Sequence, residues 1–385
     1  MKAKLLLVVF LLVSCTVESS SSQKESSFVS SSETAELEQK TFTNPMHIIQ
    51  EDGNELFVTI ADPELLAGDD GYYYMYPTNA ECEMGNKGVM FDLGPIFRSD
   101  DMQNWHYAGS AFEGNQDAIN WNIEAMKTGG VWAPSVLKVG DRYNYYYSLS
   151  GWGDTNPGIG VASSPTPYGP WTHYGKLVDQ VGSGVRNGID PHVFYEGEQL
   201  YMIWGSFFGI AIIELTDDGL EVFYGSHYKD YVKYIIENNN GTSMDINKNY
   251  EGSFLFEKDG YYYYMGSQGS CCSGISSTYR VKVGRSDTLL GPYLSKEGHD
   301  LTEEPYGELA IAPNDLVTGT GGSVLFEDFA GELWMAYHGF YKDGLDPNQR
   351  VLFIDKVLFD AEGWPYIENK EASLEEKVTP WLVKR

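Results

Sequence analysis

Short runs of aromatic and β-branched residues alternate with turns rich in Gly, Asp and Pro from about residue 44 onward. Five similar units each open with a head residue and an apolar run, and an aromatic-rich run follows about eleven residues after the head. The heads are Asp62, Ala133, Asp190, Glu251 and Gly321. Apolar residues at helical spacing are largely absent from this region, which indicates an all-β fold. A unit of roughly sixty residues repeated five times predicts a five-bladed β-propeller.

The heads of the five units are expected to meet. In a propeller the first strand of each blade lines the central channel, so equivalent positions converge at one mouth of it. Three of the heads are carboxylates, namely Asp62, Asp190 and Glu251. A single acidic residue often caps a strand or forms a turn. Three at one position of the repeat predict a functional site instead.

The first part of the chain has the pattern of an export signal. A positive start and a short apolar run lead into Leu-Val-Ser-Cys, which ends at Cys15. A small residue before this cysteine is similar to the bacterial lipobox, so residues 1–15 are expected to be a lipoprotein-type signal peptide with lipid on Cys15. The alternative is an ordinary signal peptide with an incidental cysteine. In either case we expect export, and with the lipid an anchor in the bacterial cell envelope, periplasmic or at the cell surface.

The remaining chain divides into a tether and a domain. Residues 16–43 are rich in Ser and Glu and poor in large apolar residues, which predicts a solvated tether. Residues 44–385 are expected to form the propeller. Inside it, the polar segment 230–247 predicts a long loop.

The charge of the chain excludes several partners. Its 385 residues include 55 acidic and 26 basic ones, for a formal net charge of −29. Nucleic acid and anionic lipid surfaces need a basic footprint that is missing here, and polyanionic polymers are repelled. A neutral plant cell-wall polysaccharide is not repelled, and the 28 tyrosines and 9 tryptophans supply rings for sugar stacking as well as for packing between blades. We expect a monomer.

Cysteine pairing has two solutions. With Cys15 lipidated, three cysteines remain, an odd number for an exported protein. Cys271 and Cys272 form a vicinal disulfide, or one of them pairs with Cys82 and leaves a free thiol. No histidine lies at ligand spacing from the pair, so no metal is expected there.

Three carboxylates suit the cleavage of a glycosidic bond. One carboxylic acid protonates the leaving oxygen, and one carboxylate activates water or attacks the anomeric carbon. An inverting enzyme separates the two by roughly 6.5 to 9.5 Å, a spacing that different blades across a channel allow. A third carboxylate beside the acid raises its pKa by like-charge repulsion.

Several motifs together resemble glycoside hydrolase family 43. They are Ala-Asp-Pro at Asp62, Trp-Ala-Pro at Trp132, Asn-Gly-Ile-Asp-Pro-His-Val-Phe at Asp190, and Tyr-Glu-Gly at Glu251. The stretch from Gly269 to Ser286 looks like the arabinanase branch of that family. The resemblance covers about residues 45–367, and it implies a five-bladed propeller that inverts configuration at the anomeric carbon.

The resemblance also implies roles for single residues. Asp62 corresponds to the general base, Glu251 to the general acid, and Asp190 to the group that orients the acid and raises its pKa. His338 and Arg350 correspond to positions that face the substrate or the channel; the alternatives are a core histidine and a surface ion pair. Trp132 and Asn187 correspond to sugar contacts, with packing as the alternative.

One departure concerns a cofactor. Relatives of this type show Gly-Pro-Gly-His-Asn at the head of blade five, where the histidine helps to hold a channel metal, commonly assigned as calcium. This chain has Gly319-Thr-Gly-Gly-Ser, with Gly322 in place of the histidine. No certain cofactor is therefore carried over, and one imidazole from His338 with waters would make a weak calcium site.

The sequence thus predicts hydrolysis of α-L-arabinofuranosyl linkages in arabinan, in an endo manner on the 1,5-linked backbone. The first alternative is an exo-acting arabinofuranosidase or a relative acting on galactofuranose or xylose. The second is a surface glycan-binding propeller without catalysis. Loop lengths at the channel mouth decide between endo and exo action.

Overall fold

The computed structural model describes residues 35–50, 52–83, 89–237 and 244–385. The chain divides into the segment Met1–Ala35 and the compact unit Glu36–Arg385, and the structure below is that of the second unit. The predicted signal peptide and Cys15 lie outside the described residues. Within the described ranges, no helix has the length and apolar character needed to cross a membrane.

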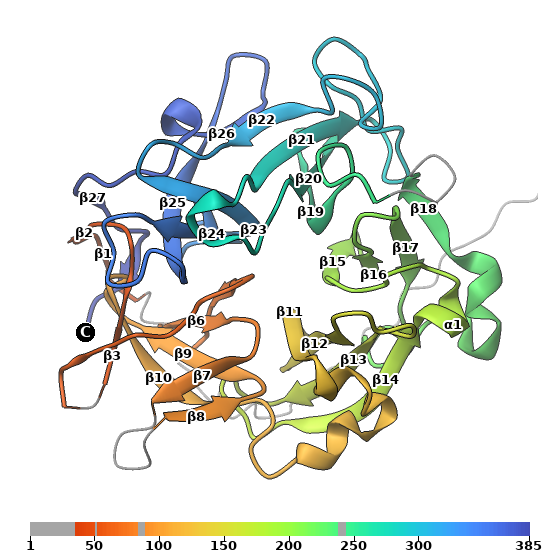
Figure 1. Ribbon diagram of the computed structural model, residues 1–385, viewed down its shortest axis with the longest axis horizontal. Helices are drawn as coiled ribbons and strands as arrows, with labels where there is room; N and C mark the ends of the chain where they lie inside the picture. The colour runs from red at the N-terminus through yellow and green to blue at the C-terminus, as the bar shows by residue number, and fades with distance from the viewer. Residues whose placement is uncertain (1–34, 51, 84–88, 238–243) are drawn as a thin grey trace, which may run out of the picture. The chain divides into compact units, whose positions relative to one another are not determined.

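Five sheets surround a central axis in this unit, which confirms the five-bladed β-propeller (Figure 1). Strand order runs outward from the channel in every blade, and the four strands of each blade pair in an antiparallel manner. Blade 1 contains β5 (Glu64–Ala67), β6 (Tyr73–Tyr76), β9 (Pro95–Ser99) and β10 (Asn104–Ser110). Blade 2 contains β11 (Gly129–Val139), β12 (Arg142–Gly151), β13 (Gly158–Ser164) and β14 (Thr172–Asp179). Blade 3 contains β15 (His192–Glu196), β16 (Gln199–Trp204), β17 (Ile210–Glu214) and β18 (Lys233–Ile236).

The last two blades have the same build. Blade 4 contains β19 (Glu251–Lys258), β20 (Tyr261–Gln268), β21 (Arg280–Ser286) and β22 (Glu308–Ile311). Blade 5 contains β23 (Val317–Glu327), β24 (Leu333–Tyr341), β25 (Arg350–Phe359) and β26 (Pro365–Ile367). Blade 1 is extended by β3 (His47–Ile49), parallel to β10, and by β4 (Glu55–Leu56).

Short elements lie between the strands, within blades as well as between them. They are the hairpin of β7 (Ala80–Glu83) and β8 (Val89–Asp92), the four-residue helix α1 (Gln180–Ser183), and the 3-10 helices η2 (Gln116–Asn122), η3 (Ala125–Lys127), η4 (Gly225–Tyr231), η6 (Gly274–Ser276) and η7 (Glu368–Lys370). Helix is therefore a minor component of the described residues.

The two ends of the unit pair with each other, so the predicted domain boundary at residue 44 is wrong. β1 (Leu37–Glu38) pairs with β28 (Leu382–Val383), and β2 (Thr41–Phe42) pairs with β27 (Lys377–Val378). Residues 36–43 thus belong to the folded unit and not to a tether. Composition alone misses this, because the backbone groups of the segment are satisfied by partners more than three hundred residues away.

The loop expected over residues 230–247 contains the outer strand of blade 3. β18 pairs with β17, with Ile236 opposite Ile210. Ile235 and Ile236 are buried, which supplies the apolar contact that holds this edge strand. The polar residues around it led to the wrong prediction for this part of the segment.

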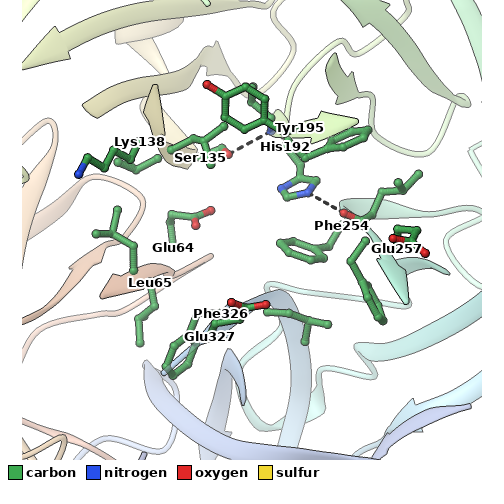
Figure 2. A pocket seen from close by; sticks show the side chains of 18 of the residues that line it. Glu64, Leu65, Ser135, Lys138, His192, Tyr195, Phe254, Glu257, Phe326 and Glu327 are labelled. Atoms are coloured by element: carbon green, nitrogen blue, oxygen red, sulfur yellow. Dashed lines mark hydrogen bonds between the residues drawn. The ribbon is translucent and has the colours of Figure 1, made fainter. Parts of the chain in front are cut away.

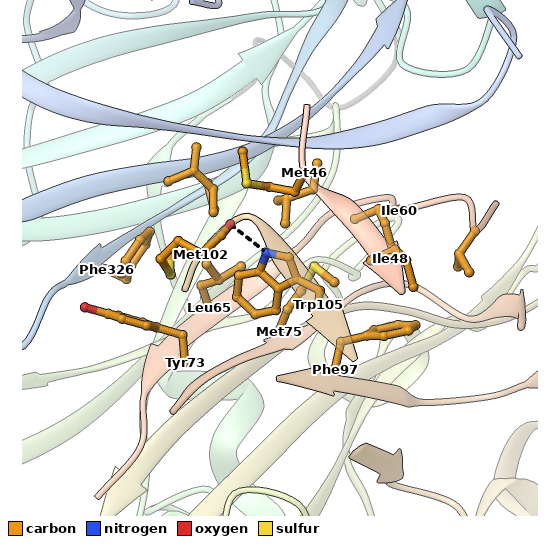
Figure 3. Close-up of a cluster of buried hydrophobic side chains, with 14 of the residues drawn as sticks. Met46, Ile48, Ile60, Leu65, Tyr73, Met75, Phe97, Met102, Trp105 and Phe326 are labelled. Atoms are coloured by element: carbon orange, nitrogen blue, oxygen red, sulfur yellow. Dashed lines mark hydrogen bonds between the residues drawn. The ribbon is translucent and has the colours of Figure 1, made fainter. Parts of the chain in front are cut away.

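Aromatic and aliphatic side chains fill the spaces between blades. Figure 3 shows the cluster at the junction of blades 5 and 1, where Phe326 meets Tyr73 and Trp105 lies beside Met75. Trp105 is fully buried and donates from Nε1 to the carbonyl oxygen of Met102 at 3.1 Å. Much of the aromatic content is therefore interior packing between blades, one of the two uses expected from the sequence.

Candidate active site

Five residues, one in each blade, share an unusual backbone conformation at one mouth of the channel. The residues with positive φ there are Asp62 (47°), Ala133 (39°), Asp190 (58°), Gly252 (53°) and Gly322 (55°). These five, and the residues that follow each of them, also line the same narrow section of the channel. These five residues are the equivalent positions of the repeat and therefore the true blade heads. Glu251 and Gly321 each precede an equivalent position by one residue, so the predicted repeat phase was wrong in blades 4 and 5.

A ring of hydrogen bonds joins the heads to their neighbours. The backbone N–H of each head donates to a side chain from the preceding blade: Asp62 to His338 Nδ1 (3.1 Å), Ala133 to Thr78 Oγ1 (3.0 Å), Asp190 to Ser148 Oγ (2.8 Å), Gly252 to Asp190 Oδ2 (3.0 Å) and Gly322 to Ser267 Oγ (3.0 Å). Each bond satisfies a backbone donor that has left its strand ladder. The ring thus fixes the five heads relative to one another, and with them the carboxylates.

Asp62 is the accessible carboxylate of the site. Its side chain is 26% exposed, and its Oδ2 accepts from Thr78 Oγ1 at 2.9 Å. Its Oδ1 lies 3.5 Å from His338 Nδ1. These contacts orient the carboxylate while leaving it open to the cavity, as a group that acts on water requires.

Glu251 is a buried carboxyl in the same cavity. Its Oε2 accepts from Ser206 Oγ at 2.7 Å and its Oε1 from Tyr279 OH at 2.9 Å. Burial raises the pKa of Glu251 to about 7, against the lowering effect of the Ser206 and Tyr279 hydroxyls. The group is thus able to hold a proton near neutral pH.

Asp190 shares that electrostatic environment. Burial raises its pKa well above the usual value, and the charges of Glu251 and Asp62 raise it further. Because like charges in one buried site resist joint ionisation, Asp190 and Glu251 together retain a proton near neutral pH. Asp190 also accepts the N–H of Gly252, the residue after Glu251, and so fixes the backbone that carries this carboxyl.

His338 lies beside Asp62 but is not part of the cavity lining, and its contact with substrate stays a prediction. Its side chain is fully buried and is not among the residues that line the cavity. Burial lowers the pKa of His338 to about 3, so the ring is neutral. Its Nδ1 accepts the Asp62 N–H, and the residue therefore connects blade 5 to blade 1 and positions Asp62.

The residues around Gly322 do not fit a calcium site. Because the Asp62 N–H can only donate, His338 Nδ1 is the acceptor and the proton of the neutral ring is on Nε2, which leaves no lone pair for a cation. A Cβ on Gly322 would lie 2.4 Å from Asp62 Oδ1, so this position has no room for the expected side chain. Among the described residues no three His, Cys, Asp or Glu side chains group as metal ligands, and calcium takes six to eight oxygen ligands.

A cavity of about 810 Å³ opens over the three carboxylates. Of the predicted sugar contacts, Trp132, Asn187 and Arg350 all line it. Asn187 donates from Nδ2 to Ser206 Oγ at 2.9 Å, so it also belongs to the hydrogen-bond network of Glu251. The structure therefore brings these three residues to the wall of the cavity, whereas His338 contacts Asp62 without lining the cavity.

Sequence reasoning missed several residues of the cavity. Trp152 lines it with 70% of its surface exposed, and its ring centroid lies 5.7 Å from that of Trp132. An exposed tryptophan between glycines, in Ser-Gly-Trp-Gly, was a usable signal. Ser206 and Tyr279 carried no such signal, because nothing in their local sequence marks them as partners of Glu251.

The channel has a second pocket beyond the carboxylates. It has a volume of about 550 Å³, and Glu64, Ser135, His192 and Phe254 line it (Figure 2). A narrow section of about 40 Å³ lies between this pocket and the carboxylates. Glu64 lines both the pocket and the narrow section, and burial raises its pKa well above the usual value.

Replacing Glu64 by Gln is expected to stabilise the protein at neutral pH. A carboxyl whose pKa is raised on folding destabilises the folded state progressively as pH rises from the unfolded pKa to the folded one. The gain should be on the order of 1 kcal/mol and should vanish below about pH 4, where both states of Glu64 are protonated. Thermal unfolding of wild type and Glu64→Gln at pH 3.5 and pH 7.5 measures this, and equal melting temperatures at pH 7.5 would contradict it.

Comparison with known proteins agrees with this architecture. The model of glycosyl hydrolases family 43 matches residues 56–365. The extracellular exo-α-(1→5)-L-arabinofuranosidase of Cellvibrio japonicus is 30% identical over 74% of this chain and 84% of its own length. The extracellular endo-α-(1→5)-L-arabinanase 1 of Bacillus subtilis is 30% identical over 70% of this chain and 78% of its own.

A solved structure has the same fold. The α-L-arabinanase of Cellvibrio cellulosa, in complex with arabinohexaose, superposes with a TM-score of 0.67 at 25% identity, over 81% of this chain and 96% of that one. The family match spans most of the propeller, including all three carboxylates. The chain therefore belongs to family 43 of the glycosyl hydrolases and is a glycosidase acting on O-glycosyl bonds.

Proposed function

We propose that this protein is an exported, inverting hydrolase of α-L-arabinofuranosyl linkages in arabinan, acting within the 1,5-linked backbone. The observation that carries this proposal is the difference between two carboxyls in one cavity. Glu251 is buried with a pKa raised to about 7, whereas Asp62 is partly exposed. One is suited to give a proton and the other to take one.

In the proposed mechanism Glu251 is the general acid. Its proton passes to the glycosidic oxygen as the bond to the anomeric carbon breaks, and the bonding electrons leave with that oxygen. The cavity keeps the carboxyl protonated until the leaving oxygen arrives, because burial disfavours its charged form. Asp190 keeps Glu251 in place through Gly252 N–H.

Asp62 is the general base. It takes a proton from a water molecule on the opposite face of the sugar, and the water oxygen forms the new bond to the anomeric carbon. Thr78 and His338 hold Asp62 in position for this step. No group on the protein bonds to the sugar, so the configuration inverts.

The cavity suits a neutral sugar chain. Trp132 and Trp152 offer rings for sugar C–H faces. Arg350 offers donors and the amide oxygen of Asn187 an acceptor for hydroxyl groups. Endo action follows the Bacillus subtilis relative, whose name carries an endo activity. Exo action is the second candidate, since the Cellvibrio japonicus relative of equal identity carries an exo activity in its name.

Statements on location, assembly and cofactor complete the proposal. Both curated relatives are named as extracellular proteins, which supports export of this chain. We further propose lipid attachment at Cys15, a monomeric state and no need for a channel metal. Palmitate labelling of the wild type and of Cys15→Ala in a bacterial host tests the lipid.

The function is tested by the products released from linear 1,5-arabinan by purified residues 36–385. Mixed oligosaccharides at early times would support endo action, and arabinose alone would mean exo action. Proton NMR of the first product should show the β-anomer at the newly formed reducing end. An α-anomer would contradict inversion, and binding of arabinan without any product would favour the non-catalytic alternative.

A further inference from the structure

The loop between β20 and β21, residues 269–279, carries a disulfide at the edge of the active-site cavity. Cys271 and Cys272 are bonded to each other, which resolves the two pairings open from the sequence. Cys271 is partly exposed and Cys272 is exposed, and both line the cavity with Asp62 and Glu251. Cys82 is a buried free thiol that does not line it.

The same loop supports the proton donor. The carbonyl oxygen of Ser270 accepts from the N–H groups of Thr278 (3.1 Å) and Tyr279 (3.2 Å), which ties the two ends of the loop together. Tyr279 OH then donates to Glu251 Oε1. The loop therefore contains the disulfide and contacts Glu251 through Tyr279, both on the blade 4 side of the cavity.

We propose that the Cys271–Cys272 disulfide is a contact surface for the sugar unit that leaves when the linkage is cut. This inference rests on the proposed function. An acid protonates the oxygen of the departing unit, so that unit lies beside Glu251 in blade 4, away from Asp62 in blade 1. The disulfide lines the cavity on that same side.

The chemistry of the disulfide suits the C–H face of a sugar. Its two sulfur atoms are polarisable and uncharged, and they carry no proton to donate. Adjacent bonded cysteines have few rotatable bonds, so contact with a ligand orders little that was mobile before. The nearby Ser270 and Ser273 hydroxyls bond to each other at 2.6 Å, which leaves the sulfur pair as the apolar part of this wall. The sulfur pair therefore favours binding of the sugar unit on the leaving side of the cleaved bond.

The test compares two substrates with the same non-reducing part. Linear 1,5-α-L-arabinotetraose places sugar on the leaving side, whereas 1,5-α-L-arabinobiosyl fluoride has only fluoride there. In the double variant Cys271→Ala/Cys272→Ala, kcat/KM for the tetraose should fall about tenfold, mainly through KM. The value for the fluoride should not change, and reduction of the wild type by a phosphine should reproduce the pattern.

Controls separate contact from loop structure. Tyr279→Phe removes the support of Glu251 but keeps the disulfide, so it should shift the alkaline limb of the pH profile, which the double variant should not shift. An equal fall for both substrates, a shifted limb in the double variant or no fall for the tetraose would overturn the proposal. If the wild type cleaves neither substrate, the proposed function fails instead, whatever the disulfide does.

Discussion

Glu251→Gln is expected to lower kcat/KM for arabinan by about a thousandfold, while arabinobiosyl fluoride loses far less. The amide has the shape of the carboxyl, and its oxygen keeps one of the two hydroxyl hydrogen bonds while its NH2 group faces the other hydroxyl. It cannot transfer a proton to the glycosidic oxygen. Cleavage between two sugars needs protonation of a poor leaving group, whereas fluoride departs with little help. Steady-state kinetics on both substrates measures the difference.

The exposed Glu257, in the same strand β19, supplies the matched control, since Glu257→Gln should leave both substrates unaffected. An equal loss of both substrates in Glu251→Gln would mean that this residue is not the acid. Retention of arabinan cleavage within tenfold would mean that another group donates the proton.

The pH profile of the wild type gives the same assignment independently. Because the raised pKa of Glu251 is about 7, the carboxyl is protonated below that pH and loses its proton above it. Activity on arabinan should therefore decline as pH rises through about 7, the pKa that burial gives this residue. With arabinobiosyl fluoride, Glu251→Gln should show no such decline, and a decline of unchanged position in that variant would contradict the assignment.

The number of blades was predictable because each blade is one repeat of the same apolar pattern. The position of the head residue within the repeat was not predictable for blade 4. Residues 261–264 are four tyrosines in a row, so counting back from a tyrosine does not define a unique register. The strand pairing places Tyr263 opposite Phe256 and Tyr201 opposite Phe194, which makes Gly252 and not Glu251 the equivalent of Asp190.

The three carboxylates were still identified correctly as neighbours, because the residue before the head also faces this mouth in blade 4. What supports them was beyond the sequence. Ser206 and Tyr279 approach Glu251 from 45 and 28 positions away along the chain, and no local motif encodes such a contact. His338 was singled out from the sequence, but only the structure shows that the lone pair on its Nδ1 accepts the Asp62 N–H.

Asp62→Asn is expected to abolish turnover of both substrates, by about a thousandfold or more in kcat. The water must lose a proton in either reaction, so a better leaving group does not compensate for a missing base. The fold should be unaffected, because the Asp62 N–H still donates to His338 and the asparagine oxygen still accepts from Thr78. Kinetics on arabinotetraose and arabinobiosyl fluoride, beside melting temperatures, gives the comparison.

The exposed Asp141 provides the control, since Asp141→Asn should match the wild type. Sparing of the fluoride in Asp62→Asn would make Asp62 resemble an acid and reverse the two roles. Full activity in Asp62→Asn together with a loss of activity on both substrates in Asp190→Asn would assign the role of general base to Asp190. The pattern of two substrates against the two variants Asp62→Asn and Glu251→Gln therefore assigns each proton transfer to one carboxyl, because only the acid step depends on the leaving group.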